Sequence, residues 1–348
     1  MAAIPIRPSP LLARPPTTII TRRNSYYFES QRFLPIHPPP TRVLAVNLMN
    51  TCSQIAPSYS PNSPLWTVSE IAEAVNGRIV EWGPPGTIST DTRTLENGQW
   101  FFAISGTSFD AHDFITPELY TKGCIGVIGN WVYDNWDRGF VQVEGNTLFA
   151  LEKMAIYARN RFHGCLIGLT GSVGKTTTRT MIALALETLG PVHQTHGNWN
   201  TRIGVALSLI GISRNVQFAV LELGMSAEGE ILELARMCRP SVRVILNVGA
   251  SHLENFSSLE EVSMAKGEIL IEAKPGDVCV LNADDPLVMS LPVPVGVKKG
   301  GICDLQSRSA FGSQCMCGGS CCKFVGGFSF SSWEILIEIY SRSHEIKT

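Results

Sequence analysis

The segment "GLTGSVGKTTTR", residues 168–179, combines a glycine-rich turn with a lysine and several hydroxyl side chains. Gly171 and Gly174 allow the backbone to turn its N–H groups towards phosphate oxygens. A helix that begins just beyond them would offer its positive end to the same anion. Lys175 can neutralise β- and γ-phosphates, and the Thr176 hydroxyl can hold Mg²⁺. These residue types in this order predict a phosphate-binding loop.

The common phosphate-loop pattern G-x-x-x-x-G-K-[ST] is not met, because Leu169 occupies the place of its first glycine. The context still favours a nucleotide site, since a short apolar run precedes the segment and a helical pattern follows it. The alternative is a glycine–serine turn with a lysine on the surface.

Two polar residues interrupt or follow apolar runs that are typical of buried strands. Glu222 lies within "AVLELG", and a buried carboxylate needs a cation or a hydrogen-bond donor. His252 follows "VRVILNVG" by three residues, so we expect it at the same sheet edge as the loop. Together they could share a magnesium or manganese ion. The alternative is a capping histidine and a salt-bridged glutamate.

Lys266 lies in a helical pattern, on the same face as Leu259, Val262 and Leu270. A lysine on such a face usually extends its ammonium group to water. If it cannot, its pKa falls and the neutral amine becomes available for chemistry. Carbamylation by CO₂ would then convert it into an anion able to bridge metal ions.

Two groups of elements must position these residues. The first is a small α/β domain, with a helix within 65–80 capped by Thr67 or Ser69 and strands at 100–104, 123–130 and 140–144. The second has strands at 165–169, 218–224, 242–249 and 277–285, with helices at 147–162, 177–189, 228–238 and 258–272. This alternation predicts a parallel sheet covered on both faces, with ligands beyond the carboxyl ends of its strands.

The two ends of the chain differ in composition from the middle. Residues 1–64 contain six arginines, no lysine and one acidic residue, Glu29, and are rich in Pro, Ser and Thr. This composition predicts a disordered transit peptide and linker, and favours the plastid stroma over the mitochondrion. The alternative is a disordered tail without a targeting role. Residues 298–348 are expected to form an aberrant low-complexity tail. Its cysteine-rich stretch "CMCGGSCC" does not predict a zinc site, because it lacks the two well-spaced cysteine pairs of such a site.

The net charge of −2 gives no electrostatic case for nucleic acid or for an anionic membrane. The sequence has no apolar run of the length that a transmembrane helix needs. We therefore expect small-molecule substrates as partners, and a monomer.

Four stretches together resemble the Mur ligases, over roughly residues 65–295. "TGSVGKTTT" resembles the TGxxGKT/S phosphate loop of that family, and "DTRTLENGQWFFAISGTSFDAHDFI" resembles its uridine-nucleotide domain. "GNWNTRIGVALSLI" is similar to a segment of the members that add D-alanyl-D-alanine. "LELGMSAEGEI" and "NVGASHLENFSSLEEVSMAKGEIL" together resemble the family's metal-binding region. The chain departs from the usual pattern at Thr201, at Ala206 and in "GMSAEGE".

The resemblance implies an α/β fold with a uridine-nucleotide domain at 65–146 and an incomplete central ATP domain at 147–297, the family's C-terminal ligase domain being absent. It also implies roles for individual residues. ATP and its phosphates would contact Thr170, Gly171, Ser172, Val173, Gly174, Lys175, Thr176, Thr177 and Asn282. Magnesium, or manganese in its place, would be held by Thr176, Glu222 and His252. The catalytic residues would be Lys175, His252 and a carbamylated Lys266. The UDP substrate would contact Asp91, Thr92, Arg93, Asp110, His112, Asn198 and Asn200.

The activity that the resemblance implies is that of an ATP-dependent carbon–nitrogen ligase of peptidoglycan precursor synthesis. ATP would phosphorylate the terminal carboxylate of UDP-MurNAc-tripeptide, and the amine of D-Ala-D-Ala would displace the phosphate. A chain without the third domain could bind these ligands without joining them. Two alternatives stay open: a non-enzymatic plastid scaffold or nucleotide-binding protein with the same fold, and a ligase like folylpolyglutamate synthase.

Overall fold

The structure is a computed structural model that describes residues 66–106, 109–251 and 254–302. The predicted transit peptide, His252 and most of the predicted C-terminal tail lie outside these ranges. Within the described ranges, no helix combines the length and the apolar character needed to cross a membrane.

The N-terminal part begins with helix α2 (Val68–Val75), which starts where the sequence predicts. Thr67 is its N-cap: the Thr67 hydroxyl accepts the N–H of Glu70, and the Glu70 carboxylate accepts the N–H of Thr67 at 3.0 Å. This reciprocal pair satisfies two N–H groups that a helix start would otherwise leave unbonded. Of the two predicted caps, Thr67 is therefore the correct one.

A five-stranded sheet follows, in the order β1-β5-β4-β3-β2. Its strands are β1 (Arg78–Glu81), β2 (Thr87–Ser89), β3 (Gln99–Phe102), β4 (Gly126–Gly129) and β5 (Gly139–Gln142), with the short helices η1 (Ala111–Phe114) and α3 (Glu118–Thr121) between β3 and β4. Strand β1 runs antiparallel to β5, and the other pairs are parallel. The Trp100 ring is fully buried against β4 and β5, where a Cβ atom on Gly126 or Gly139 would overlap it.

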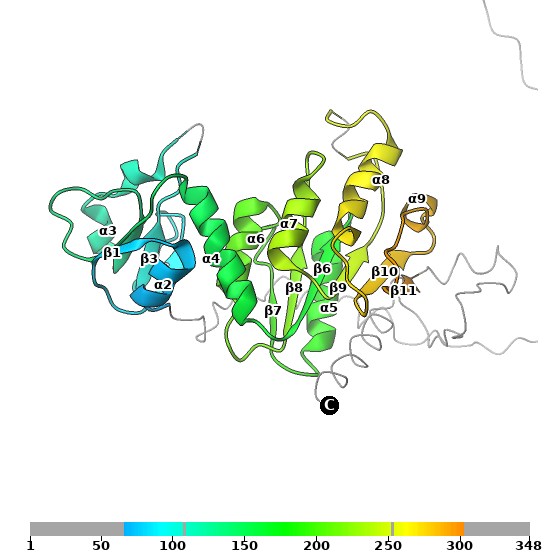
Figure 1. The fold of residues 1–348 in the computed structure, drawn as a ribbon, viewed down its shortest axis with the longest axis horizontal. Coiled ribbons are helices and arrows are strands. Elements are labelled where there is room, and N and C mark those ends of the chain that lie inside the picture. Colours follow the sequence, from blue (N-terminus) through cyan, green and yellow to red (C-terminus); the bar gives the residue numbers. More distant parts are fainter. Residues whose placement is uncertain (1–65, 107–108, 252–253, 303–348) are drawn as a thin grey trace, which may run out of the picture. The chain divides into compact units, whose positions relative to one another are not determined.

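The central part is a six-stranded sheet, in the order β11-β10-β9-β6-β8-β7 (Figure 1). Its strands are β6 (Cys165–Thr170), β7 (Val192–Gln194), β8 (Phe218–Glu222), β9 (Val242–Ile245), β10 (Val278–Asn282) and β11 (Lys298–Ile302). Its helices are α4 (Thr147–Arg161), α5 (Lys175–Leu186), α6 (Arg202–Ile210), α7 (Glu230–Cys238), α8 (Leu259–Gly267), η2 (Glu268–Leu270) and α9 (Pro286–Met289). All strand pairs in this sheet are parallel, as the sequence predicts.

Alternate residues along the central strands belong to two separate apolar clusters, because successive side chains in a strand point to opposite faces. Ala219 and Leu221 pack in the cluster that contains α4, α6, α7 and α8, whereas Phe218 and Val220 pack in the cluster that contains α5. Both faces of the sheet are therefore covered. The α/β class and the covered parallel sheet are confirmed.

Three details of the predicted elements need correction. Helix α5 starts at Lys175 and not at 177. The loop ends at Gly174, which has a φ of 81° and is the N-cap of the helix. Leu259 is 38 % exposed and does not share the buried face of Val262. The sheet also continues past the expected boundary at 297, since β11 (Lys298–Ile302) pairs in parallel with β10. Its sequence, "KKGGI", lacks the β-branched run that would have indicated a strand.

Arg243 is a buried charge that ties β9 to the segment before β10. It is 2 % exposed and donates hydrogen bonds to the carbonyl oxygens of Ile269 (2.8 Å) and Glu272 (3.1 Å) and to the carboxylate of Asp277 (2.6 Å). We expect Arg243→Ala to lower the free energy of unfolding by about 3–5 kcal/mol, because it removes one partner of a buried ion pair. Urea denaturation followed by circular dichroism measures this change.

The control is Arg236→Ala, which removes the exposed ion pair between Arg236 and Glu272. We expect this variant to lose less than about 1 kcal/mol. Equal losses in the two variants would contradict the role given to Arg243.

Candidate functional site

The polar residues singled out from the sequence gather at the carboxyl edge of the central sheet. The phosphate loop follows β6, Glu222 is the last residue of β8, and Asn282 is the last residue of β10. The segment with Asn198 and Asn200 follows β7. In an open parallel sheet this edge is where ligands bind.

The loop between β6 and α5 is held in place by Asn247, which follows β9. The Asn247 Oδ1 atom accepts the N–H groups of Ser172 and Val173, both at 3.0 Å, and its Nδ2 atom donates to the Val173 carbonyl at 3.1 Å. The Ser172 hydroxyl also accepts the N–H of Gly249 at 2.8 Å. These bonds join β6 and β9 across the site and fix the loop backbone.

Lys175 folds back onto the loop that precedes it. Its Nζ atom donates to the carbonyl oxygen of Gly171 at 2.8 Å, with the Ser172 carbonyl at 3.5 Å. Burial lowers the pKa of Lys175, and the nearby Glu222 carboxylate opposes that shift. The ammonium group is therefore a half-buried positive charge at the mouth of the loop.

Glu222 is the fully buried carboxylate that the sequence predicts at the end of a strand. Its Oε2 atom accepts the Thr176 hydroxyl at 3.3 Å. Its Oε1 atom lies 3.0 Å from Nη1 of Arg179, which makes an ion pair by distance. That contact lacks the geometry of a hydrogen bond, and Oε1 accepts none from the described residues. One lone-pair direction of a buried carboxylate is therefore left open.

This arrangement fits a divalent cation. The Glu222 Oε1 atom, which accepts no hydrogen bond from the described residues, and the adjacent Thr176 hydroxyl are oxygen ligands of the kind that Mg²⁺ prefers. Among the described residues, no group of three His, Cys, Asp or Glu side chains could hold a metal ion. A cation here would therefore need ligands beyond these side chains, and in phosphate-loop proteins Mg²⁺ takes several from phosphate and water.

Lys266 is buried on α8, with 2 % of its surface exposed. Burial lowers its pKa to about 8, and the positive charge of Lys175 adds to the shift. The Lys266 side chain thus does not extend to water, so the condition under which the sequence predicts a lowered pKa is met. Near neutral pH an appreciable fraction of this amine carries no proton.

The remaining residues predicted for ATP surround the loop and the end of β10. Gly174 and Thr177 are exposed, Val173 is 68 % exposed, and the buried Thr170 hydroxyl has no hydrogen-bond partner among the described residues. The Asn282 side chain is engaged with backbone: its Nδ2 atom donates to the Leu246 carbonyl at 2.9 Å, and its Oδ1 atom accepts the N–H of Asp284 at 3.0 Å. Asn282 thus shapes the turn after β10, and its predicted contact with adenine stays a prediction.

The predicted substrate residues of the N-terminal part lie in loops after two neighbouring parallel strands, β2 and β3. Asp91 and Arg93 form an ion pair at 2.7 Å, with the Arg93 side chain almost fully exposed. Asp110 caps η1 by accepting the N–H of His112 at 3.0 Å, and it also contacts the His112 ring at 2.5 Å. The His112 Nε2 atom accepts the N–H of Asn130, so this buried ring serves the fold.

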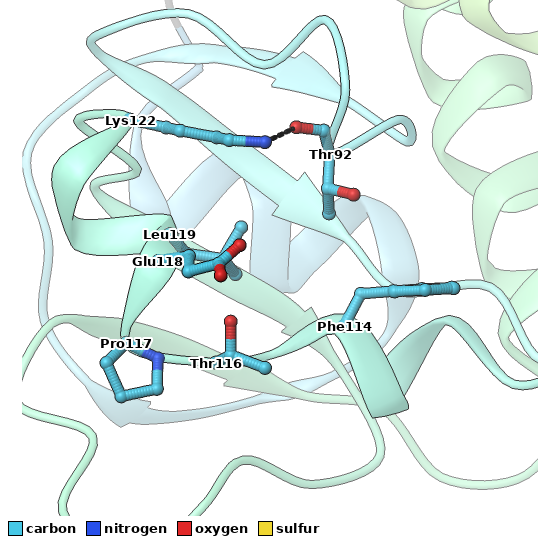
Figure 2. A pocket seen from close by; sticks show the side chains of 7 residues that line it. All are labelled: Thr92, Phe114, Thr116, Pro117, Glu118, Leu119 and Lys122. Carbon is cyan, nitrogen blue, oxygen red and sulfur yellow. Dashed lines mark hydrogen bonds between the residues drawn. The ribbon is translucent and has the colours of Figure 1, made fainter.

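A hollow of about 300 Å³ lies beside Thr92 (Figure 2). Its lining residues are Thr92, Phe114, Thr116, Pro117, Glu118, Leu119 and Lys122. The Lys122 ammonium reaches across it and donates to the Thr92 carbonyl at 2.5 Å. Of the residues predicted to contact the UDP substrate, only Thr92 belongs to this lining.

Asn198 and Asn200 belong to a tight turn next to β8. The N–H of Asn200 donates to the Asn198 carbonyl at 2.6 Å, and the Asn200 carbonyl accepts the N–H of Gly224 at 2.8 Å. This segment is therefore bonded to Gly224, which follows Glu222 by two residues in the chain.

Sequence reasoning missed two residues that organise the site, Asn247 and Arg179. Arg179 had a signal, because it occupies the same helical stripe as the buried Ile182, Ala183 and Leu186. Asn247 follows an apolar strand as Glu222 does, but nothing in the sequence shows that it faces the loop after β6.

Comparisons with known proteins agree with this geometry. Residues 169–297 match the model of the Mur ligase middle domain. This part of the chain is a Mur ligase middle domain, and it contains α5, the phosphate loop and Glu222.

Its relatives are UDP-N-acetylmuramoyl-tripeptide–D-alanyl-D-alanine ligases. The Synechocystis enzyme is 39 % identical over 203 residues, which cover 58 % of this chain and 44 % of the relative. A crystal structure of MurF from Acinetobacter baumannii matches with a TM-score of 0.63 and 30 % identity, over 69 % of this chain and 54 % of that one. MurF ligase from Thermotoga maritima, in complex with ADP, matches with a TM-score of 0.54 and 32 % identity, over 63 % of this chain and 50 % of that one. The chain thus spans about half the length of these proteins.

We expect Asn247→Ala to loosen the phosphate loop without unfolding the sheet. The Val173 N–H would lose its acceptor, whereas the Ser172 N–H would keep the backbone carbonyl of residue 247 at 3.1 Å. Hydrogen exchange of the Val173 N–H should therefore quicken by on the order of tenfold or more. Hydrogen exchange of a peptide that covers residues 170–176, followed by mass spectrometry, measures the effect. Unchanged exchange would show that Asn247 does not hold the loop.

Proposed function

We propose that this chain acts in an ATP-dependent carbon–nitrogen ligase that joins D-Ala-D-Ala to UDP-MurNAc-tripeptide. The observation that carries the proposal is the set of Lys175, Thr176 and Glu222 at one sheet edge, with the buried Lys266 electrostatically coupled to Lys175. The substrates come from the names of its relatives.

In this proposal the loop N–H groups and the start of α5 bind the β- and γ-phosphates of ATP. Lys175 turns from the Gly171 carbonyl to the phosphates and neutralises their charge. Thr176 and Glu222 hold Mg²⁺, which, when bound, offsets the charge on the phosphoryl group in transfer. Manganese has the same ligand preferences and could replace it.

The reaction then needs two substrates positioned against ATP. The γ-phosphoryl group passes to the terminal carboxylate of the tripeptide, giving an acyl phosphate and ADP. The amine of D-Ala-D-Ala attacks the acyl carbon, an amide bond forms, and inorganic phosphate leaves with the bonding electrons. The protein contributes positioning and charge neutralisation. Asn198 and Asn200, in the turn that is bonded to Gly224, would help to position the tripeptide carboxylate.

We assign the uridine end of the substrate to the loops after β2 and β3. They place Asp91, Thr92, Arg93 and Asp110 at one edge of the N-terminal sheet, where the buried His112 ring holds Asp110 in position. The hollow beside Thr92 offers space at this edge (Figure 2).

We expect Lys175→Ala to weaken ATP binding by at least about a hundredfold, because it removes a half-buried positive charge from the phosphate site. Titration of the chain with a fluorescent ATP analogue measures this. Lys153→Ala, which removes an exposed lysine from α4, is the control and should bind as the parent chain does. Equal affinities in all three proteins would reject the loop assignment.

Ligation is tested separately, because the chain spans about half the length of its relatives. A chimera that continues after residue 302 with the remaining part of the Synechocystis ligase should release ADP only when UDP-MurNAc-tripeptide and D-Ala-D-Ala are both present. ADP release that does not depend on D-Ala-D-Ala would argue against the proposed substrates.

Lys266 is proposed to carry a carbamate. At fixed bicarbonate, the carbamylated fraction follows the fraction of neutral amine, so it should rise with pH and level off above about pH 8. The carbamylated fraction of an ordinary lysine, with its pKa of about 10.4, would rise only at a pH about two units higher. Carbon-13 NMR with labelled bicarbonate measures the carbamate signal, and Lys266→Arg should abolish it. A signal that persists in Lys266→Arg belongs to another amine.

The same pKa shift predicts how stability depends on pH. Because the folded pKa of Lys266 is about 8 and the unfolded pKa is 10.5, the unfolded chain binds more protons between these values. The contribution of Lys266 to the free energy of unfolding should therefore rise from pH 8 to pH 10.5. Without bicarbonate, Lys266→Met should be more stable than the parent chain at pH 7, and this advantage should shrink above pH 8. Urea denaturation of both proteins at several pH values tests whether the free energy of unfolding changes in these two directions.

A further inference from the structure

Arg179 is a buried charge to which the proposed function assigns no role. It lies on the second turn of α5, within the apolar stripe of Ile182, Ala183 and Leu186, and is 7 % exposed. Burial lowers its pKa, and the Glu222 carboxylate opposes the shift. An arginine buried at this cost needs partners that compensate its charge.

One nitrogen of this guanidinium group serves two partners. Nη1 lies 3.0 Å from Oε1 of Glu222 and donates a hydrogen bond to the Gly197 carbonyl at 2.7 Å. Nη2 has a weak contact with the Thr180 hydroxyl at 3.5 Å. The buried Nε atom has no hydrogen-bond partner among the described residues. Arg179 thus lies between the Glu222 carboxylate and the turn after β7.

That turn is attached to the end of β8 at two further points. The Thr195 hydroxyl accepts the N–H of Glu222 at 3.0 Å, and the Asn200 carbonyl accepts the N–H of Gly224 at 2.8 Å. Between them, Gly197 has a φ of 52°, a conformation that favours glycine. Residues 197–200 therefore form a short loop, here called the Gly197 loop, whose first residue is held by Arg179.

We propose that Arg179 is a positioning residue that ties Glu222 to the Gly197 loop and competes with a divalent cation for that carboxylate. The inference rests on the proposed function in one respect, the cation at Glu222. Arg179 supplies a positive charge to Oε1, the oxygen that accepts no hydrogen bond. A cation on the same carboxylate would repel the guanidinium group and loosen its hold on the Gly197 carbonyl. Occupancy of the metal site would in this way be transmitted to the loop that carries Asn198 and Asn200.

Three variants of the full chain separate the parts of this proposal. Arg179→Gln removes the charge, and Arg179→Lys keeps the charge on a shorter side chain, whose ammonium nitrogen cannot reach the position of Nη1 between the two partners. Arg159→Gln is the matched control, because Arg159 is also partly buried and donates to backbone carbonyls, those of Cys238, Phe162 and Arg239. Circular dichroism first establishes that each variant is folded.

The first measurement needs no ligand. Hydrogen exchange of a peptide that covers residues 195–201 should quicken by on the order of tenfold in Arg179→Gln. It should quicken less in Arg179→Lys and stay unchanged in Arg159→Gln. Unchanged exchange in Arg179→Gln, or an equal change in Arg159→Gln, would overturn the tie between Arg179 and the loop.

The second measurement uses Mn²⁺ alone, detected by electron paramagnetic resonance of the free ion. Arg179→Gln should bind Mn²⁺ on the order of tenfold more tightly than the parent chain, because a competing positive charge is gone. A residue that only supported the fold would weaken binding when replaced. Equal or weaker binding in Arg179→Gln would overturn the competition. If the parent chain binds no Mn²⁺ with or without ATP, the metal assignment and the competition both fail. The hydrogen-exchange measurement still tests whether Arg179 holds the Gly197 loop.

Discussion

The site depends on one buried carboxylate, Glu222, at the end of a central strand. A carboxylate inside a protein is costly unless cations or hydrogen-bond donors surround it. The Thr176 hydroxyl and the Arg179 guanidinium group provide that environment, and Lys175 lies close enough to interact electrostatically. Each comes from α5, so the helix that is proposed to offer its N-terminus to phosphate also supplies the groups that stabilise the carboxylate.

The parallel sheet is what brings these groups together. Its strands β6, β7, β8, β9 and β10 all end at the same edge, so short loops after each one meet there. Asn247 joins the loops after β6 and β9, while Thr195 and Asn200 attach the turn after β7 to β8. Most of these contacts are hydrogen bonds to backbone groups, which fix loop positions independently of any ligand. The site is therefore organised by the described chain itself.

Much of this could be predicted from the sequence, for identifiable reasons. Glu222 and Lys266 each interrupt an apolar pattern, and a polar residue in a buried pattern is informative. The phosphate loop was recognisable from its glycines and its position between a strand and a helix. Asn247 and the partners of Arg179 were not, because their roles depend on which strands are neighbours. The neighbour order β9-β6-β8 is set by the tertiary structure, and the hydrophobic periodicity of the sequence does not reveal it. Strand β11 was missed because "KKGGI" has little strand propensity and gains its pairing from β10.

The central claim is that Glu222 and the phosphate loop form one nucleotide–metal site. It is tested most directly by calorimetric titration of ATP into the chain, with and without Mg²⁺, for the parent chain and for Glu222→Gln. The account predicts that Mg²⁺ tightens ATP binding in the parent chain and that this gain is largely lost in Glu222→Gln, which should still bind ATP without the metal. An equal gain from Mg²⁺ in both proteins would contradict the account, because the cation would then be held without the buried carboxylate.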